Sequence, residues 1–158
     1  MLYAPPIAEL DKIQKPKGAR PNWGYCGIAA MSAATGINHL EILEAIPEWP
    51  GYTPSRMVIK TLEQFGYKVE RILIPKDKQA SWPAYMPEYP SRVALGRIYY
   101  GDGKYSDSHW ICFRWVNGGW IHRILLYDNL FRHDCWFNVV GKCFYRPPTK
   151  LKSLYFVV

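Results

Sequence analysis

The strongest constraint on the fold is a run of small residues that follows a cysteine, from Cys26 to Thr35. Gly24-Tyr25 before this run favours a turn and Gly36 after it supplies a helix stop, so the pattern predicts a helix over residues 26–35. Small side chains allow such a helix to pack closely against a sheet or a second helix. The unpaired amides of its first turn favour an anion, so we expect the Cys26 thiol to ionise more readily than an ordinary thiol.

The remainder of the chain predicts two more helices followed by strands. Asn38, with Glu41 three residues on, is typical of a capping box and begins a helix that ends before Pro47. Thr53-Pro54 begins a third helix, with the proline at its first helical position and Gly66 at its end. Helices first and antiparallel strands after them indicate an α+β fold. The strands are expected over residues 67–74, 92–100, 109–116, 120–127, 136–145 and 154–158.

The chain length and composition indicate one globular domain. The 158 residues are 49% hydrophobic, which allows a proper core and excludes a disordered chain. Residues 1–21 contain four prolines, and we expect them to form an irregular N-terminal arm with an exposed apolar start. Residues 22–158 are expected to form the single domain.

The segment from His109 to Asp128 predicts a β-hairpin, because Asn117-Gly118-Gly119 carries the strongest two-residue turn signals. With Gly118-Gly119 as the loop, His109 lies directly opposite Asp128; with Asn117-Gly118 as the loop, the two are diagonal neighbours. Both registers place the imidazole and the carboxylate on one face, with Cβ atoms roughly 5 Å or about 7–8 Å apart. A three-residue loop would change the parity and present Asn129 instead. We favour Asp128.

A thiol, an imidazole and a carboxylate in this chain order are the parts of a cysteine hydrolase. The carboxylate of Asp128 would fix the imidazole tautomer and favour its protonated form. The imidazolium of His109 would stabilise the Cys26 thiolate and then protonate the leaving amine. The backbone amide of Cys26 could serve as one donor to an oxyanion.

At these positions the chain resembles the papain-like cysteine peptidases, and among them the small bacterial and phage forms of the C39-like group. The resemblance rests on Cys26-Gly27-x-x-Ala30, on Ser108-His109-Trp110 at the start of a strand and on Tyr127-Asp128-Asn129 at the end of the next. It implies an N-terminal helical lobe packed on a C-terminal antiparallel β-sheet lobe, with a cleft between them. It also implies thiol-dependent cleavage of a peptide or isopeptide bond, with Cys26 as nucleophile, His109 as general base and acid, and Asp128 as orienting residue.

The sequence departs from this family at the position six residues before the cysteine, where the family usually places a glutamine as oxyanion donor. Arg20 stands there, and Asn22 is the nearest side-chain amide, so both are oxyanion candidates. The departure keeps an alternative open, in which a catalytically degenerate papain-like fold binds a protein or forms part of an assembly, such as that of a phage. Residues expected to line the substrate cleft are Trp23, Gly24, Tyr25, Ser108 and Trp110.

Several other classes of function are disfavoured by the sequence. The net charge is +7, but no run of lysine and arginine is dense enough for a tail that binds nucleic acid. His133-Asp134-Cys135 with Cys143 fits no common zinc spacing, so we expect no metal and no cofactor. No apolar stretch is long enough to cross a membrane, and no signal peptide is apparent. We therefore expect a polypeptide substrate or protein partner in a reducing cytoplasm, or a virion-associated protein if the chain comes from a phage.

Overall fold

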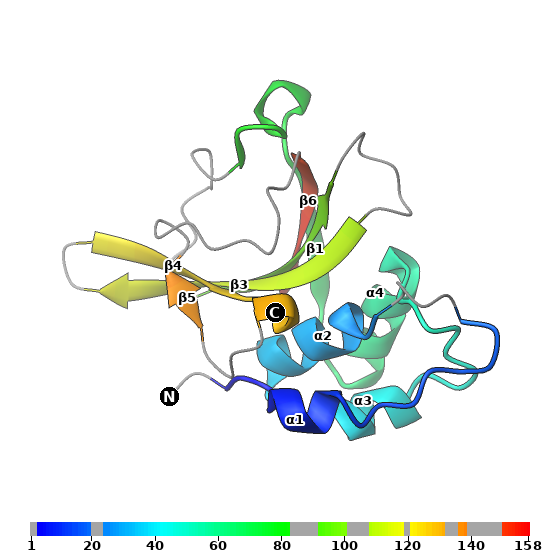
Figure 1. Cartoon of the computed structure of the whole chain (residues 1–158). Helices are drawn as coiled ribbons and strands as arrows, with labels where there is room; N and C mark the ends of the chain where they lie inside the picture. Colours follow the sequence, from blue (N-terminus) through cyan, green and yellow to red (C-terminus); the bar gives the residue numbers. More distant parts are fainter. Residues whose placement is uncertain are drawn as a thin grey trace.

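The computed structural model describes residues 3–19, 24–82, 92–100, 108–118, 121–131, 136–138 and 150–158. The described helices are α1 (Ile7–Leu10), α2 (Cys26–Thr35), α3 (His39–Glu44) and α4 (Ser55–Gln64), and the 3₁₀ turns are η1 (Lys76–Lys78) and η3 (Asn129–Phe131). These four helices precede an antiparallel sheet along the chain (Figure 1), so the predicted α+β class is confirmed. None of the helices within the described ranges has the length and apolar character needed to cross a membrane.

The described residues form a sheet of six strands in the spatial order β1-β6-β2-β3-β4-β5, with antiparallel pairing throughout. The last strand of the chain lies between β1 and β2 and is longer than the sequence predicts, because it pairs with a neighbour on each side. The strands are β1 (Val69–Leu73), β2 (Val93–Tyr99), β3 (Ser108–Gly118), β4 (Ile121–Tyr127), β5 (Phe137–Asn138) and β6 (Lys150–Val157).

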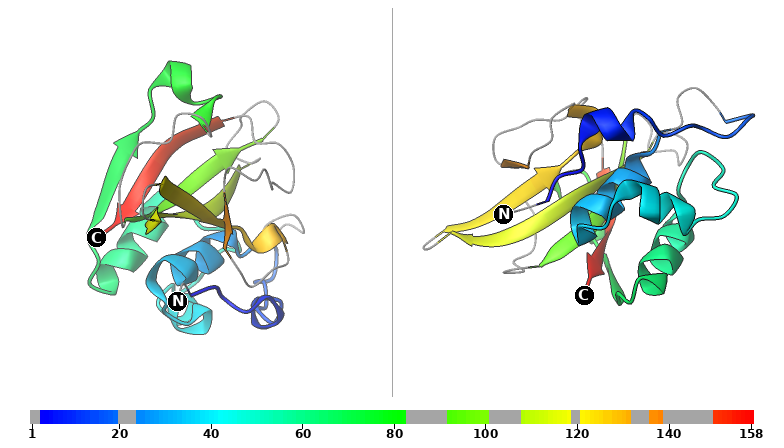
Figure 2. Two further views of the ribbon diagram at one scale, coloured as in Figure 1. Left: turned by 90° about the vertical axis from the view of Figure 1, so that its left-hand side faces the viewer. Right: turned by 90° about the horizontal axis from the view of Figure 1, so that it is seen from below.

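The helix α2 packs against β3 and β2 and is the central helix of the fold (Figures 1 and 2). The prediction of this helix is confirmed at both ends. Gly36 ends it in the left-handed conformation (φ 77°), and its N–H donates to the Ser32 carbonyl at 2.8 Å. All residues from Gly27 to Ala34 are buried, which explains why small side chains fill the helix on every side.

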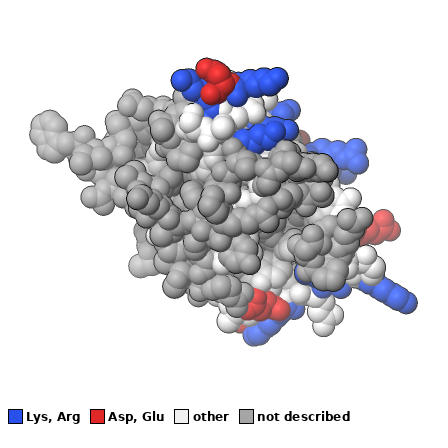
Figure 3. Space-filling model, turned by 45° about the horizontal axis from the view of Figure 1, so that its top comes forward, with Lys and Arg blue, Asp and Glu red and all other residues white. Residues whose placement is uncertain are grey.

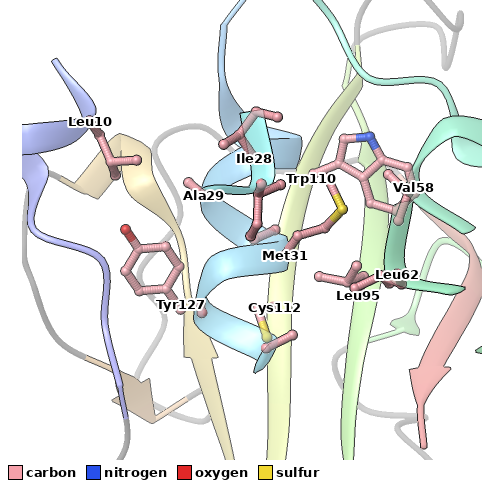
Figure 4. Close-up of a cluster of buried hydrophobic side chains, with 14 of the residues drawn as sticks. Leu10, Ile28, Ala29, Met31, Val58, Leu62, Leu95, Trp110, Cys112 and Tyr127 are labelled. Carbon is pink, nitrogen blue, oxygen red and sulfur yellow. The ribbon is translucent and has the colours of Figure 1, made fainter. Parts of the chain in front are cut away.

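Apolar side chains cover both faces of the sheet. On the helical side, Ile28, Met31, Leu62 and Trp110 belong to one core cluster with Tyr127 (Figure 4). The opposite face carries a second core cluster, which combines strand residues with three residues outside the strands: Ile74, Trp82, Ala94, Ile98, Tyr100, Ile111, Phe113, Trp115, Leu126, Leu151, Leu154 and Phe156. Alternation along β2 and β3 therefore supplies two cores, which is the pattern expected of a sheet covered on both faces.

The caps of α3 and α4 differ in detail from the predicted ones. Asn38 is the N-cap of α3, but its side chain accepts the N–H of Leu40 at 2.9 Å and not that of Glu41. Pro54 is the N-cap residue of α4 and not its first helical residue. Both helices nevertheless begin within a residue of the predicted position, because a cap fixes where helical hydrogen bonding begins.

Residues 3–19, the described part of the predicted N-terminal arm, are not irregular throughout, and their large aliphatic side chains are not exposed. This segment contains α1, and Ile7, Leu10 and Ile13 are buried in the core on the helical side of the sheet. The segment is also held by hydrogen bonds, because the Tyr127 hydroxyl donates to the Pro5 carbonyl at 3.3 Å and the Trp136 indole donates to the Tyr3 carbonyl at 2.8 Å. The spacing of three between the buried apolar residues is the sequence signal for this packing.

Candidate active site

The β3–β4 hairpin has a register that differs from both predicted ones. Gly118 pairs with Ile121, so the pairing closes one residue later along the chain than a Gly118-Gly119 loop would place it. A two-residue loop preserves the parity of the pairing. Continued beyond the last pair, Cys112↔Tyr127, this register places His109 opposite Leu130 and leaves Asp128 as its diagonal neighbour on the same face.

His109 and Asp128 meet at the end of this hairpin. The imidazole Nε2 lies 2.6 Å from Asp128 Oδ1, and the two side chains are 6% and 0% exposed. The same carboxylate oxygen accepts the backbone N–H of Leu130 at 2.9 Å, where the chain turns from β4 into η3. This turn holds the carboxylate in place, so that it orients the ring. Asn129 is also buried, but its side-chain oxygen has no hydrogen-bond partner among the described residues.

Cys26 is the first residue of α2 and lies partly exposed beside the buried His109. Its sulfur forms a hydrogen bond with the His109 side chain and accepts the backbone N–H of Trp110. Burial raises the pKa of the Cys26 thiol, but the charge of His109, these two hydrogen bonds and the charge of Arg97 together hold the pKa below its ordinary value. The residue is therefore partly exposed, and its thiol is predisposed to ionise.

His109 is predisposed to carry the matching positive charge. Burial lowers the pKa of the imidazole, but the carboxylate of Asp128, the thiolate of Cys26 and its hydrogen bonds to both raise the pKa from 6.5 to about 10. Because Nε2 is engaged by Asp128, Nδ1 is the ring nitrogen left to face the sulfur. The arrangement favours a thiolate–imidazolium pair backed by a carboxylate, which is the state that a nucleophilic cysteine requires.

Gly27 and Thr53 bring the helix and the strand of this site together. A Cβ atom added at Gly27 would lie 2.6 Å from the Thr53 Cβ, so only glycine permits this approach. The backbone carbonyl of Thr53 accepts the indole N–H of Trp110 at 2.7 Å. Thr53 thus contacts both the residue after Cys26 and the residue after His109, and this shared contact fixes the two elements relative to each other.

The expected cleft residues have different surroundings. Trp110 is 2% exposed and its ring packs against Tyr155, so its contribution to the site is its backbone N–H and not a cleft wall. The Tyr25 hydroxyl donates to Asp11 Oδ1 at 2.6 Å, which ties the turn before Cys26 to the end of α1. Gly24 has open space where a side chain would be, and Ser108 contacts Arg97. Arg20, Asn22 and Trp23 lie outside the described residues.

Two residues of interest were missed or misplaced by sequence reasoning. Arg97 is not among the predicted site residues, although it is the one charged residue in the apolar strand Val93–Tyr99 and is 8% exposed. His39 directly follows the N-cap Asn38, a position typical of a solvent-facing helix start, but it is 1% exposed and neither ring nitrogen has a partner among the described residues. The packing of α3 against α2 buries this position, which a single N-cap pattern does not reveal.

Other features of the described surface lie away from Cys26. A hollow between α3 and α4 is lined by Ile46, Pro47, Arg56, Met57 and Lys60, among others, and includes neither Cys26 nor His109. On the face shown in Figure 3, lysine and arginine side chains of the described residues stand in separate groups, some beside aspartate or glutamate. The segment His133-Asp134-Cys135 and Cys143, considered above for zinc, lies outside the described residues.

Comparison with known proteins yields a likeness of fold. No protein-family model and no curated protein matches the sequence. Among solved structures, the chain is similar to the peptidase domain of Streptococcus ComA, a bi-functional ABC transporter involved in a quorum-sensing pathway. The two share 12% identity with a TM-score of 0.50, over 87% of this chain and 94% of that domain. At this identity the likeness concerns the fold, and it supports the papain-like architecture implied by the sequence motifs.

Proposed function

We propose that this protein is a thiol-dependent hydrolase, a cysteine peptidase that cleaves a peptide or isopeptide bond. The observation that carries the proposal is the convergence of Cys26, His109 and Asp128, with the imidazole 2.6 Å from the carboxylate and hydrogen bonded to the thiol. These residues come from α2, β3 and the end of β4, and each has the exposure that its role requires. Cys26 is partly exposed, and the base and the carboxylate behind it are buried.

The chemistry proceeds in two halves. The Cys26 thiolate attacks the carbonyl carbon of the scissile bond, and the backbone N–H of Cys26 at the helix start is a donor available to the oxyanion. The His109 imidazolium gives its proton to the leaving amine and then, as the neutral base, takes a proton from the water that hydrolyses the thioester. Asp128 keeps the ring oriented throughout. An amine in place of water in the second half would give acyl transfer by the same residues.

The resemblance to the C39-like peptidases supports the class of reaction. The ComA neighbour is itself a peptidase domain, and in our proposal the helices α2–α4 form one lobe and the sheet the other, with substrate bound where Cys26 and His109 meet. The free thiols of Cys26 and Cys112 are consistent with a reducing cytoplasm, and the alternative is a virion-associated protein if the chain comes from a phage.

The test is site-specific labelling together with peptide cleavage. Wild-type protein and the variants C26A, H109A and C112A are incubated with a peptidyl electrophile that mimics a scissile amide, and with a peptide library whose products are read by mass spectrometry. C112A is the matched control, because Cys112 is fully buried and burial raises the pKa of its thiol. We expect labelling and cleavage in wild type and C112A, and neither in C26A.

One alternative makes a different prediction for the same experiment. A degenerate papain-like fold that binds a protein is favoured by Arg20 at the position of the usual glutamine. Under that alternative, folded wild-type protein would give no more labelling or cleavage than C26A. Labelling that persists in folded C26A would contradict the assignment of the nucleophile.

A further inference from the structure

Arg97 is a nearly buried cation at the edge of the candidate active site. It lies in β2 directly opposite Trp110 of β3, and it is 8% exposed. A buried arginine is costly unless its charge and its donors are engaged, so its position in an otherwise apolar strand calls for a specific role.

The guanidinium contacts the two residues that flank His109. Its Nε donates to the Ser108 hydroxyl at 2.9 Å, and its central carbon lies 5.3 Å from the centroid of the Trp110 ring. An arginine can form both contacts together because its guanidinium is planar and donates in its plane while stacking on an aromatic face. Arg97 therefore holds β3 on both sides of the imidazole.

The same contacts reach the sulfur by a second route. Trp110 donates its backbone N–H to Cys26, and its indole N–H donates to the Thr53 carbonyl at 2.7 Å. A tilt of the Trp110 ring would alter the indole hydrogen bond, and a shift of the β3 backbone at Trp110 would alter the other. Against the rise that burial causes, the charge and the hydrogen bond of His109, the backbone N–H of Trp110 and the charge of Arg97 lower the pKa of the Cys26 thiol, so Arg97 acts on the sulfur through geometry and through charge.

We propose that Arg97 is a positioning residue for the Cys26–His109 pair. By contacting both Ser108 and Trp110, Arg97 fixes the imidazole and the Trp110 amide against the sulfur. This inference rests on the proposed function. Arg97 lies outside the Cys26, His109 and Asp128 cluster. Replacing it reduces the reactivity of the thiol, although Arg97 itself does not contact the substrate.

The test is the pH dependence of Cys26 alkylation by iodoacetamide, in which the thiolate sulfur forms a bond to carbon and iodide leaves. The modified Cys26 peptide is quantified by mass spectrometry, so that the other cysteines do not contribute. The variants are R97M, R97K and S108A. R92M is the matched control, because Arg92 stacks on Phe156 and pairs with Glu70 at the other end of β2, roughly 16 Å away along the strand.

The expected result is a graded rise in the pH midpoint of alkylation. In R97M the midpoint rises by about 0.5–1 unit, so that the rate at pH values below both midpoints falls about three- to tenfold. In R97K the charge remains but the planar fork is lost, and the midpoint lies between those of R97M and wild type. S108A loses one contact of Arg97 and shows a smaller rise, and R92M retains the wild-type midpoint.

Two results would overturn the inference. One is a folded R97M protein with the wild-type midpoint, even if its melting temperature is lower, because Arg97 would then be structural. The other is R97K indistinguishable from wild type, which would mean that charge alone suffices. If R97M does not fold, R97K and S108A decide in the same way. A wild-type midpoint near that of an ordinary thiol would instead refute the proposed function itself.

Discussion

Replacing Asp128 by asparagine tests the electrostatic core of the site, because it removes a charge and keeps a side chain of nearly the same shape. The asparagine oxygen can still accept the backbone N–H of Leu130, so the turn into η3 is expected to persist. The substitution removes the negative charge that lies 2.6 Å from His109 Nε2. Both side chains are buried there, with 6% of His109 and 0% of Asp128 exposed.

The magnitude follows from the geometry. With charge centres about 4 Å apart and an effective dielectric constant of about 20, the attraction is about 4 kcal/mol, equivalent to about three pKa units. The pKa of His109, raised to about 10 in the wild type against the lowering effect of burial, is therefore expected to fall to about 7 in D128N. Above that pH the variant loses the imidazolium that stabilises the Cys26 thiolate.

The same shift determines how stability depends on pH. The pKa of His109 in the folded protein lies above the ordinary value of 6.5, so its contribution to folding is fully present below pH 6.5 and is lost as the pH rises through about 10. In D128N that loss is complete about three units earlier. Urea unfolding between pH 6 and pH 10 should show the free energy of unfolding of the wild type falling steadily from about pH 6.5 to about pH 10, while that of D128N stops falling near pH 7.

The assay is an NMR titration of the histidine ring signals, with the His109 signal assigned by its absence in H109Q. N129A is the matched control, because Asn129 is the neighbouring buried residue that a different hairpin parity would have presented to the histidine. N129A should leave the pKa of His109 unchanged. A pKa that is unchanged in D128N but lowered in N129A would refute the reasoning and assign the orienting role to Asn129.

Three further predictions concern the residues that support the site. G27A brings a Cβ atom to 2.6 Å from the Thr53 Cβ, so the free energy of unfolding measured in urea should fall by about 1–3 kcal/mol. An unchanged free energy would show that the two segments separate easily. W110F leaves the Thr53 carbonyl without its indole donor, so the free energy of unfolding should fall by about 1–3 kcal/mol and Cys26 alkylation should slow. A W110F protein as stable and as reactive as wild type would contradict the role of Thr53 in joining the helix and the strand. Cys112 should remain unalkylated in native protein at pH 8 and react only after unfolding, because burial raises the pKa of its thiol. Rapid labelling of native protein would show that the core on the helical side of the sheet is open to the reagent.

Local sequence signals were sufficient for the helix and the hairpin that carry the site. The small-residue run and Gly36 predicted both ends of α2, since a left-handed glycine stop is a local property of the chain. The hairpin register was shifted by its loop, yet Asp128 still lies on the face of His109, because parity survives any change between two-residue loops. Prediction therefore succeeded where it depended on a local helix stop or on the alternation of side chains along a strand.

The features that sequence reasoning missed depend on contacts between distant segments. Nothing near Arg97 in the sequence indicates that it would stack on Trp110, because that contact is set by the pairing of β2 with β3. The hydrogen bond from Tyr25 to Asp11 and the burial of His39 likewise follow from packing of the N-terminal segment and α3 against α2. The close approach of Thr53 to Gly27 could not be predicted either, since Thr53 lies in a distant segment of the chain.

The most direct test of the account is the alkylation rate of Cys26 in wild-type protein measured from pH 4 to pH 11. We predict that the thiol reacts well below its ordinary pKa of 9.0, and that a second inflection near pH 10 marks the loss of the proton from His109. A single transition close to pH 9, unchanged in H109A, would show that sulfur and imidazole do not share a proton and would contradict the account.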